Sequence, residues 1–494
     1  MRRAHLVLAL LALAAALCPA AGAGRHAHHV RPAVLARLTS TPALFPAFSR
    51  SIHDYVVRCL PGKRTRFTTV AAAGSAPFID GVHRRTALLA LRPDQAVTIE
   101  ARNASSSADY HVRCLPADFP SFTETRTAAS SDWYMLDPSL SLGTARAHYI
   151  VIFDGNGVPV WWYRTEHVPM DAKLLPGPKG PTFAFASYPA NTPEYQIRTL
   201  KGTFVSRVVS PDARADDHDL QVAANGDYVY IVYEPVSGVD LTPYGGPADA
   251  IVLEPRIEEV SPDGKLVWSW SDDGRIGVSA TGNRWLQGLI DKPVTIPGPD
   301  GQPVAAYDLF HPNAVSLDGN VVLLSVRHTD AVYAIDKATG AILWQLGGAP
   351  SPQRLTVVGD PYGQVPFGGQ HDVRIQPDGT VSVFDDGSFL NRPPRVVRYA
   401  IDTTAHTATL VESVSDPAVT ESICCGSARR MFDGDWLVSW GGDPVVGEYR
   451  PDGTPVFKLD FGALFSYRAV PITHRRLTIA ELRSAMDAIA KKQG

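Results

Sequence analysis

Tight-turn dipeptides that recur between residues 154 and 453 constrain the fold of this chain more than any other feature. Each is Asp-Gly or Asn-Gly, the strongest short hairpin signal, because these residues tolerate the positive φ angles of a two-residue turn. Among them are Asp154-Gly155, Asn225-Gly226, Asp263-Gly264, Asp318-Gly319, Asp378-Gly379, Asp433-Gly434 and Asp452-Gly453. Short apolar runs flank them, and 40 glycines and 40 prolines scattered through 494 residues break long helices. We expect an all-β chain.

Tryptophans follow several of these turns, which adds a longer period to the pattern. The spacing of roughly 40–60 residues is typical of four-stranded β-propeller blades. We expect a six-bladed β-propeller over residues 121–475, although five or seven blades also fit. The expected blade starts lie near Tyr149, Phe183, His218, His311, His371 and Gly426. A short C-terminal helix is expected over 476–494, where Thr478 and Glu481 form a capping box.

The N-terminus has the pattern of a secretory signal peptide. Arg2 and Arg3 precede an apolar run, and Ala21-Gly-Ala23 supplies small residues for cleavage. The sequence predicts a signal peptide over 1–23, a linker over 24–50 and a secreted or periplasmic protein. No later stretch reaches the ~18 apolar residues of a membrane helix, so we expect no integral membrane segment in the mature chain.

An internal sequence repeat indicates a small domain over residues 51–120. The segment from Asp54 to Pro61 recurs from Asp109 to Pro116 with Tyr, Val, Arg, Cys, Leu and Pro in register. Its alternation is typical of strands with one buried face. We expect a small β-sandwich with a Cys59–Cys114 disulfide, the alternative being two free buried thiols.

Two further cysteines, Cys424 and Cys425, are adjacent in the sequence. In an oxidising compartment disulfides persist, so a vicinal disulfide is expected here. Two reduced thiols are the alternative.

The charge balance excludes some classes of partner. Lysine and arginine number 46 against 50 acidic residues, a net charge of −4, and only 19% of residues are charged. No basic face is implied, so we expect no nucleic-acid partner.

The turn glycines place three histidines at one register. His218, His311 and His371 each lie eight residues before the glycine of their turn. Equivalent points of equivalent blades converge on the central channel, so these imidazoles are expected to face one another. Arg327, eight residues after Gly319, is expected opposite His311 on the return strand.

Two neighbours of this set are candidate substrate-binding residues. Asn313 shares the parity of His311, and His328 follows Arg327, where strand geometry turns it to the other face.

Three histidines beside an arginine suit an oxyanion such as sulfate or phosphate better than a metal ion. Arg repels a cation, and its guanidinium is a permanently charged donor fork. A neutral imidazole can take a sulfuryl or phosphoryl group covalently. Because of the arginine we expect no metal, and because no Gly-rich phosphate loop is present we expect no nucleotide donor. No cofactor is expected.

The residues between His218 and Gly442 resemble the bacterial arylsulfotransferases, also called arylsulfate sulfotransferases. The motifs are Asp217-His-Asp-Leu, Phe310-His-Pro-Asn-Ala-Val, Leu324-Ser-Val-Arg-His, Ile342-Leu-Trp-Gln-Leu-Gly-Gly, Gly369-Gln-His-Asp-Val-Arg, Val383-Phe-Asp-Asp-Gly and Gly434-Asp-Trp-Leu-Val-Ser-Trp-Gly. The family usually has Phe-Asp-Asn-Gly where this chain has Phe384-Asp-Asp-Gly. The small N-terminal domain resembles an appended domain of a divergent branch.

The resemblance implies sulfuryl transfer between phenols by a ping-pong route. His371 would be the nucleophile that becomes a sulfohistidine, with His218, His311 and Arg327 holding the sulfate and Asn313 supporting it. The partners would be a small aryl sulfate and a phenol. Two other readings stay open: a non-catalytic propeller that binds an anionic or phenolic ligand, and a quinoprotein-type dehydrogenase.

Overall fold

The computed structural model describes residues 33–130, 132–140, 147–175, 180–188, 194–211, 215–298, 300–472 and 476–492. The expected signal peptide over 1–23 lies outside these residues. Strands dominate the described chain, which has two α-helices, α1 (Asn283–Asp291) and α2 (Ile479–Lys492). The predicted all-β class is confirmed. Within the described ranges, neither helix is long and apolar enough to cross a membrane.

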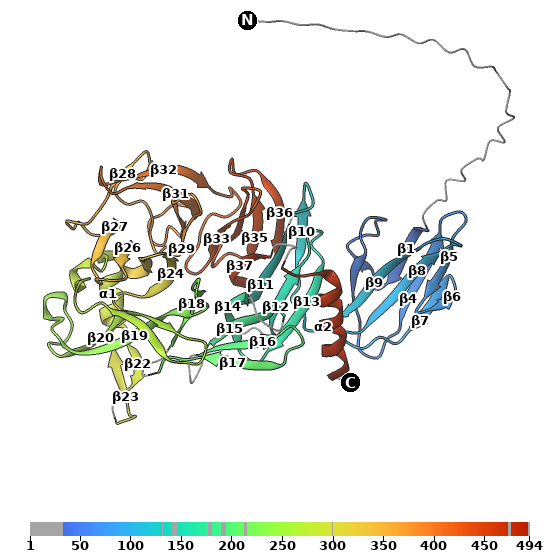
Figure 1. Cartoon of the computed structure of the whole chain (residues 1–494), viewed down its shortest axis with the longest axis horizontal. Helices are drawn as coiled ribbons and strands as arrows, with labels where there is room; N and C mark the ends of the chain where they lie inside the picture. Colours follow the sequence, from blue (N-terminus) through green and yellow to red (C-terminus); the bar gives the residue numbers. More distant parts are fainter. Residues whose placement is uncertain are drawn as a thin grey trace, which may run out of the picture.

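The small N-terminal domain is a β-sandwich of two sheets (Figure 1). Its three-stranded sheet has the order β1 (Leu35–Thr41), β4 (Thr65–Ala71), β7 (Thr86–Leu89). Its six-stranded sheet has the order β2 (Leu44–Phe45), β3 (Asp54–Arg58), β9 (Ser107–Leu115), β8 (Ala96–Arg102), β5 (Ala76–Ile79), β6 (Val82–His83). Tyr55, Val57, Tyr110 and Val112 fill the space between them.

The domain starts earlier than the sequence indicated, because β1 and β2 lie inside the expected linker over 24–50. Leu35 and Leu38 are both buried, and β1 pairs with β4 along its length. A bulge between Leu35 and Arg37 shifts the alternation by one residue. That shift removed the period of two by which a strand is recognised.

The two repeated segments form the neighbouring parallel strands β3 and β9, with Tyr55 opposite Val112 and Val57 opposite Cys114. The disulfide between Cys59 and Cys114 is present, with their Cα atoms 5.6 Å apart. The repeat therefore gives two similar strands that lie side by side and are joined by a disulfide.

Apart from the two-stranded sheet of β22 and β23, the remaining described strands form six sheets around a common centre, as expected for a six-bladed propeller. From the innermost strand outward, the first three blades are β37 (Phe465–Ile472), β11 (Trp133–Leu140), β12 (His148–Phe153), β13 (Pro159–Thr165); β14 (Val168–Leu175), β15 (Thr182–Tyr188), β16 (Tyr195–Thr199), β17 (Phe204–Val208); and β18 (Ala215–Val222), β19 (Tyr228–Val239), β20 (Ala250–Val260), β21 (Leu266–Ser271).

The last three blades are β24 (Pro312–Asp318), β25 (Val321–Val326), β26 (Ala331–Asp336), β27 (Ile342–Gly347); β29 (His371–Ile375), β30 (Val381–Asp385), β31 (Arg395–Asp402), β32 (Thr407–Val414), β28 (Thr356–Val358); and β33 (Ser427–Arg430), β34 (Trp436–Ser439), β35 (Val445–Tyr449), β36 (Pro455–Asp460), β10 (Thr123–Arg126). The elements η2 (Val278–Ala280), α1, β22 (Val294–Pro297) and β23 (Pro303–Ala306) lie between the third and fourth blades. Two 3-10 turns lie inside blades: η1 (Thr242–Tyr244) between β19 and β20 of the third, and η3 (Arg327–Thr329) between β25 and β26 of the fourth.

The ring is closed from both ends of the chain. The late strand β37 is the inner strand of the first blade, and the early strand β10 is the outer strand of the sixth. Two expected blade starts were therefore misplaced: Tyr149 lies in the third strand of its blade and Phe183 in the second. The sequence could not reveal an inner strand borrowed from the other end of the chain.

Helix α2 lies between the propeller and the small domain (Figure 1). Its capping box forms, since the main-chain N–H of Thr478 donates to Glu481 and that of Glu481 to the Thr478 hydroxyl. The expected packing on the propeller is present, against β13. Arg483 also pairs with Asp54 of the small domain at 2.6 Å, so the helix joins the two domains.

Candidate functional site

The three aligned histidines lie where the inner strands of three consecutive blades begin. His218 is in β18, His311 directly precedes β24, and His371 is the first residue of β29. β24 contacts both β18 and β29, so these strand starts are neighbours around the centre of the ring. His218 and His311 meet edge to face, with ring centroids 4.9 Å apart.

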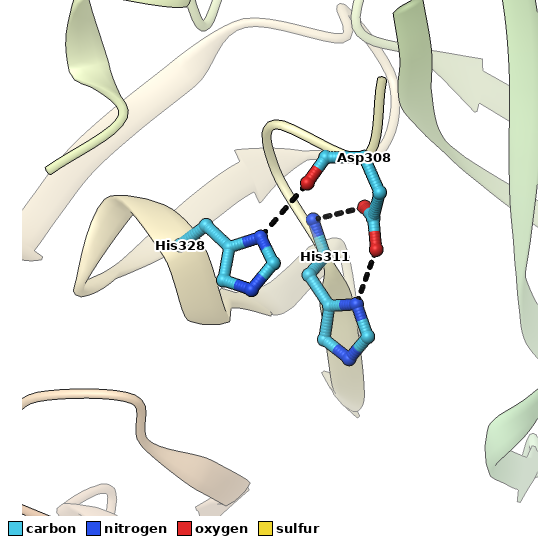
Figure 2. Close-up of side chains that lie close together, drawn as sticks. All are labelled: Asp308, His311 and His328. Carbon is cyan, nitrogen blue, oxygen red and sulfur yellow. Dashed lines mark hydrogen bonds and ion pairs between the residues drawn. The ribbon is translucent and has the colours of Figure 1, made fainter. Parts of the chain in front are cut away.

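Asp308 organises two histidines at once (Figure 2). Its carboxylate accepts from Nδ1 of His311 at 2.5 Å and from the main-chain N–H of His311 at 3.0 Å. Its main-chain carbonyl accepts from Nδ1 of His328 at 2.9 Å. Burial raises the pKa of Asp308, but the electrostatic and hydrogen-bond interactions with His311, together with those of His328 and His218, outweigh it and lower the pKa to about 2. The carboxylate is therefore ionised at neutral pH and orients His311 through Nδ1.

His218 has its own carboxylates. Its Nδ1 lies 2.7 Å from Asp216 and 3.4 Å from Asp217. Burial favours the neutral ring, but these two acids outweigh it and raise the pKa of His218 to about 9. At neutral pH His218 is a cation.

His371 is the opposite case, since it is buried and neutral. Burial, then the charge of Arg327 among others, lowers the pKa of His371 well below its usual value. Its Nδ1 faces the Gly369 carbonyl at 3.0 Å and Asp386 at 2.7 Å, and a carbonyl can only accept. Nδ1 therefore carries the proton, and Nε2 keeps its lone pair, which faces the N–H of Cys425 at 3.3 Å.

Arg327 lies opposite His311, as the turn register predicted, and its main-chain N–H donates to the His311 carbonyl at 3.0 Å. Its guanidinium donates to Nε2 of His328 at 3.1 Å and to the Ile423 carbonyl at 2.8 Å. It also stacks over the ring of Trp285 on α1, 4.4 Å from the ring centroid.

The expectation that His328 faces away from His311 is wrong. The two rings stack with centroids 4.8 Å apart. Residues 327–329 form the 3-10 turn η3 rather than a strand, so neighbouring side chains no longer alternate between two faces. Burial, then His311, lowers the pKa of His328 to about 3, so it is neutral.

Asn313 lies below this cluster rather than at its mouth, because its side chain is fully buried. Its side-chain amide donates to the main-chain carbonyl of Gln370 at 2.7 Å, and the main-chain carbonyl of Asn313 accepts from Arg468 of β37 at 3.0 Å. Arg468 in turn pairs with Asp372 at 2.7 Å. Asn313 thus belongs to a buried polar floor beneath the histidines.

The expected vicinal disulfide is absent from the structure, in which Cys424 and Cys425 are free thiols. Cys425 has φ 71°, and its N–H is directed at His371. Adjacent Cα atoms in a trans peptide are only about 3.8 Å apart, below the usual disulfide span of about 4.4–6.8 Å, so closure requires a distorted backbone. The alternative of two reduced thiols describes this structure.

The sixth blade lacks a histidine at the shared register for a steric reason. Gly426 has φ 87°, and a Cβ there would lie 2.4 Å from the ring of Phe384. Only glycine fits this position.

A cavity of about 550 Å³ shares a wall with the histidine cluster. Ser422 in that wall donates to Asp386 at 2.7 Å, and the carbonyl of Ile423 accepts from Arg327. Phe389, 74% exposed, lines the same cavity and meets Trp285 edge to face at 5.0 Å. A cavity with an aromatic ring in its otherwise largely polar wall therefore adjoins the cationic site.

Each of the three aligned histidines has an acid partner that was not predicted from the sequence. Asp216 and Asp308 lie two and three residues before their histidines, a spacing visible in the sequence. Asp386 directly follows the return strand β30, and the pairing of His371 with Phe384 brings it to His371.

These acids also create sets of possible metal ligands, Asp308 with His311 and His328, and Asp216 with Asp217 and His218. In the first set both nitrogens of His328 are already engaged, one by a carbonyl and one by the Arg327 guanidinium. A fixed cation at this point disfavours a metal ion and favours an anion.

The protein-family model described as Arylsulfotransferase (ASST) matches residues 194–462, more than half of the chain. The chain belongs to the arylsulfotransferase family. The match contains every histidine of the site together with Arg327, Cys424 and Cys425, whereas the small domain lies outside it. No curated protein sequence is similar enough to this arylsulfotransferase family member to count as a match.

Solved structures resemble it only loosely. A protein of unknown function from Bacteroides caccae has a TM-score of 0.39 at 12% identity, covering 69% of this chain and 99% of its own. A putative 6-phosphogluconolactonase from Bacteroides fragilis has a TM-score of 0.37 at 15% identity, covering 69% and 98%. Virginiamycin B lyase from Staphylococcus aureus has a TM-score of 0.33 at 12% identity, covering 73% and 90%.

Proposed function

We propose that this protein transfers a sulfuryl group from an aryl sulfate to a phenol through a sulfohistidine on Nε2 of His371. The observation that carries the proposal is the fixed, neutral tautomer of His371 beside cationic His218 and Arg327. A lone pair on Nε2 is the nucleophile that attack on sulfur requires. The two cations suit the negative charge of a sulfate ester.

The first half-reaction forms a bond between Nε2 of His371 and sulfur and breaks the bond from sulfur to the phenolic oxygen. Arg327, His218 and His311 would stabilise the charge on the sulfuryl oxygens in the transition state. His218 has a pKa of about 9, close to the ~10 of a phenol, so it is matched to protonate the departing phenolate.

The second half-reaction reverses these roles. A new phenol gives its proton to the now neutral His218, and its oxygen attacks the sulfur of the sulfohistidine. His371 is released as a neutral imidazole. The cavity beside the site, with Phe389 and Ile423 in its wall, would hold the aryl ring in both steps.

The contact from Cys425 to Nε2 must yield before attack. At 3.3 Å it is longer than the usual ~2.9–3.0 Å of such bonds, so it restrains the lone pair only weakly.

We also propose that the protein is exported to a secreted or periplasmic location. The signal-peptide pattern over residues 1–23 and the disulfide between Cys59 and Cys114 support this, since disulfides persist in oxidising compartments.

The deciding experiment treats the protein with a chromogenic aryl sulfate and measures the mass of the peptide that contains His371. A gain of one SO₃ on that peptide, lost when a phenol is added, is the expected result. His371→Ala should release no chromophore, and His406→Ala, an exposed histidine on the outer edge of the fifth blade, is the matched control. Binding of the sulfate without any mass gain would favour the non-catalytic propeller.

A further inference from the structure

Cys424 and Cys425 are adjacent free thiols beside His371. Their side chains are hydrogen-bonded to each other, and both residues are half-buried, so they keep some contact with solvent. The other two described cysteines, Cys59 and Cys114, are bonded to each other in the small domain. Among the described residues, the pair therefore has only itself as a disulfide partner.

The two thiols differ in a way that suits dithiol chemistry. The hydrogen bond from Cys425 lowers the pKa of Cys424, against burial, and the charges of Arg327 and His218 lower it further. The same hydrogen bond and burial raise the pKa of Cys425. Cys424 is thus suited to attack first and Cys425 to resolve, because the thiolate is the attacking species.

We propose that Cys424 and Cys425 are a redox-active vicinal dithiol that small disulfides oxidise, and that closure uncovers Nε2 of His371. The Cys424 thiolate attacks one sulfur of a disulfide such as oxidised glutathione and releases one thiolate of the reagent. Cys425 then attacks the Cys424 sulfur, closes the ring and releases the second thiolate. Two electrons and both thiol protons pass to the reagent, which leaves as two reduced thiols.

Closure acts on His371 because the peptide bond between the two cysteines becomes part of the ring. Since adjacent Cα atoms lie closer than a disulfide normally spans, that peptide must twist. The N–H that twists with it is the donor now directed at Nε2 of His371. The same strain makes the closed form easy to reduce, so the step is reversible.

The effect on catalysis rests on the proposed function, so the test measures thiol state and sulfuryl transfer separately. The full-length protein is equilibrated in glutathione buffers of graded ratio, free thiols are alkylated, and the peptide with both cysteines is weighed. We expect it to lose two hydrogens across these ratios, while the bonded Cys59–Cys114 pair stays unchanged as an internal control. In the closed form, the rate of the phenol burst from an aryl sulfate should rise about two- to tenfold, because one neutral hydrogen bond to Nε2 is lost.

Each other outcome is informative. Alkylation of both thiols at every ratio, or glutathione held on Cys424 without closure, overturns the redox pair. Closure with an unchanged burst overturns the uncovering of Nε2. Closure with no SO₃ on His371 in either state supports the redox pair and refutes the proposed function. Cys425→Ser keeps the main-chain N–H but removes the resolving thiol, so a redox response that survives in it, or in Cys424→Ser, also overturns the proposal.

Discussion

Nδ1 of His371 lies 2.7 Å from Oδ2 of Asp386, and the other oxygen of that carboxyl group accepts from the hydroxyl of Ser422 at 2.7 Å. The imidazole and the wall of the neighbouring cavity are thus held by one side chain. An arylsulfotransferase that uses Nε2 of this imidazole depends on the orientation that Asp386 imposes.

Replacing Asp386 with two different residues tests this role. Asp386→Asn restores the asparagine that the family usually has, and its amide oxygen can still accept from Nδ1, so most turnover should remain. Asp386→Ala removes the acceptor, and turnover should fall about 10- to 100-fold, as when other orienting partners of functional histidines are lost. Steady-state kcat with an aryl sulfate measures both. Equal loss in the two variants would mean that the charge of Asp386 matters rather than its hydrogen bond.

The pH dependence of the first half-reaction should report His218. Its pKa of about 9 means that the cation persists through neutral pH, because Asp216 and Asp217 outweigh burial. The rate of the phenol burst should therefore fall as the pH rises through about 9. Asp216→Asn removes one stabilising charge and should move this fall to lower pH. A burst that stays constant to pH 10 would exclude protonated His218 from the reaction.

The same ionisation affects stability, and the direction follows from the raised pKa. The folded protein holds the proton of His218 more tightly than the unfolded chain, whose histidine titrates near 6.5. The contribution is complete below about pH 6.5 and is lost as the pH rises through about 9. In His218→Gln the stability should change less between these two values, measured by urea unfolding.

The sequence predicted the parts of the fold and site that depend on local turns. Turn glycines fixed the positions of His218, His311 and Arg327, because hairpin register counts residues from a tight turn. The predicted direction of the His328 side chain was wrong, because the strand register ends where η3 begins. Asp386 follows the return strand of the hairpin that carries His371, so the same turn register could have indicated it. Arg468 could not be predicted, because it reaches the site from β37, far along the chain.

Phe389 should determine how well the aryl ring binds. It lines the cavity beside the site and is 74% exposed, so an aromatic ligand would bury it further. Phe389→Ala should raise KM for phenyl sulfate roughly tenfold with little change in kcat, as expected from losing about 1.5 kcal/mol of apolar burial. Phe432→Ala is the matched control, because Phe432 is 94% exposed and does not line the cavity. A similar KM in both variants would place the aryl ring elsewhere.

Arg468 should be the most costly charge to remove from the propeller. It is fully buried on β37, pairs with Asp372 at 2.7 Å and donates to the carbonyl of Asn313. Arg468→Ala leaves Asp372 buried with fewer positive partners, which costs about 3–5 kcal/mol in comparable buried pairs. Arg207→Ala breaks an ion pair whose arginine side chain is 58% exposed, and should cost about 1 kcal/mol or less. Urea unfolding followed by tryptophan fluorescence compares the two. Strand β37 also closes the ring. A large loss of unfolding free energy in Arg468→Ala would therefore show that one side chain stabilises both the polar floor beneath the histidines and the closure of the propeller. Equal urea midpoints for Arg468→Ala and Arg207→Ala would contradict this.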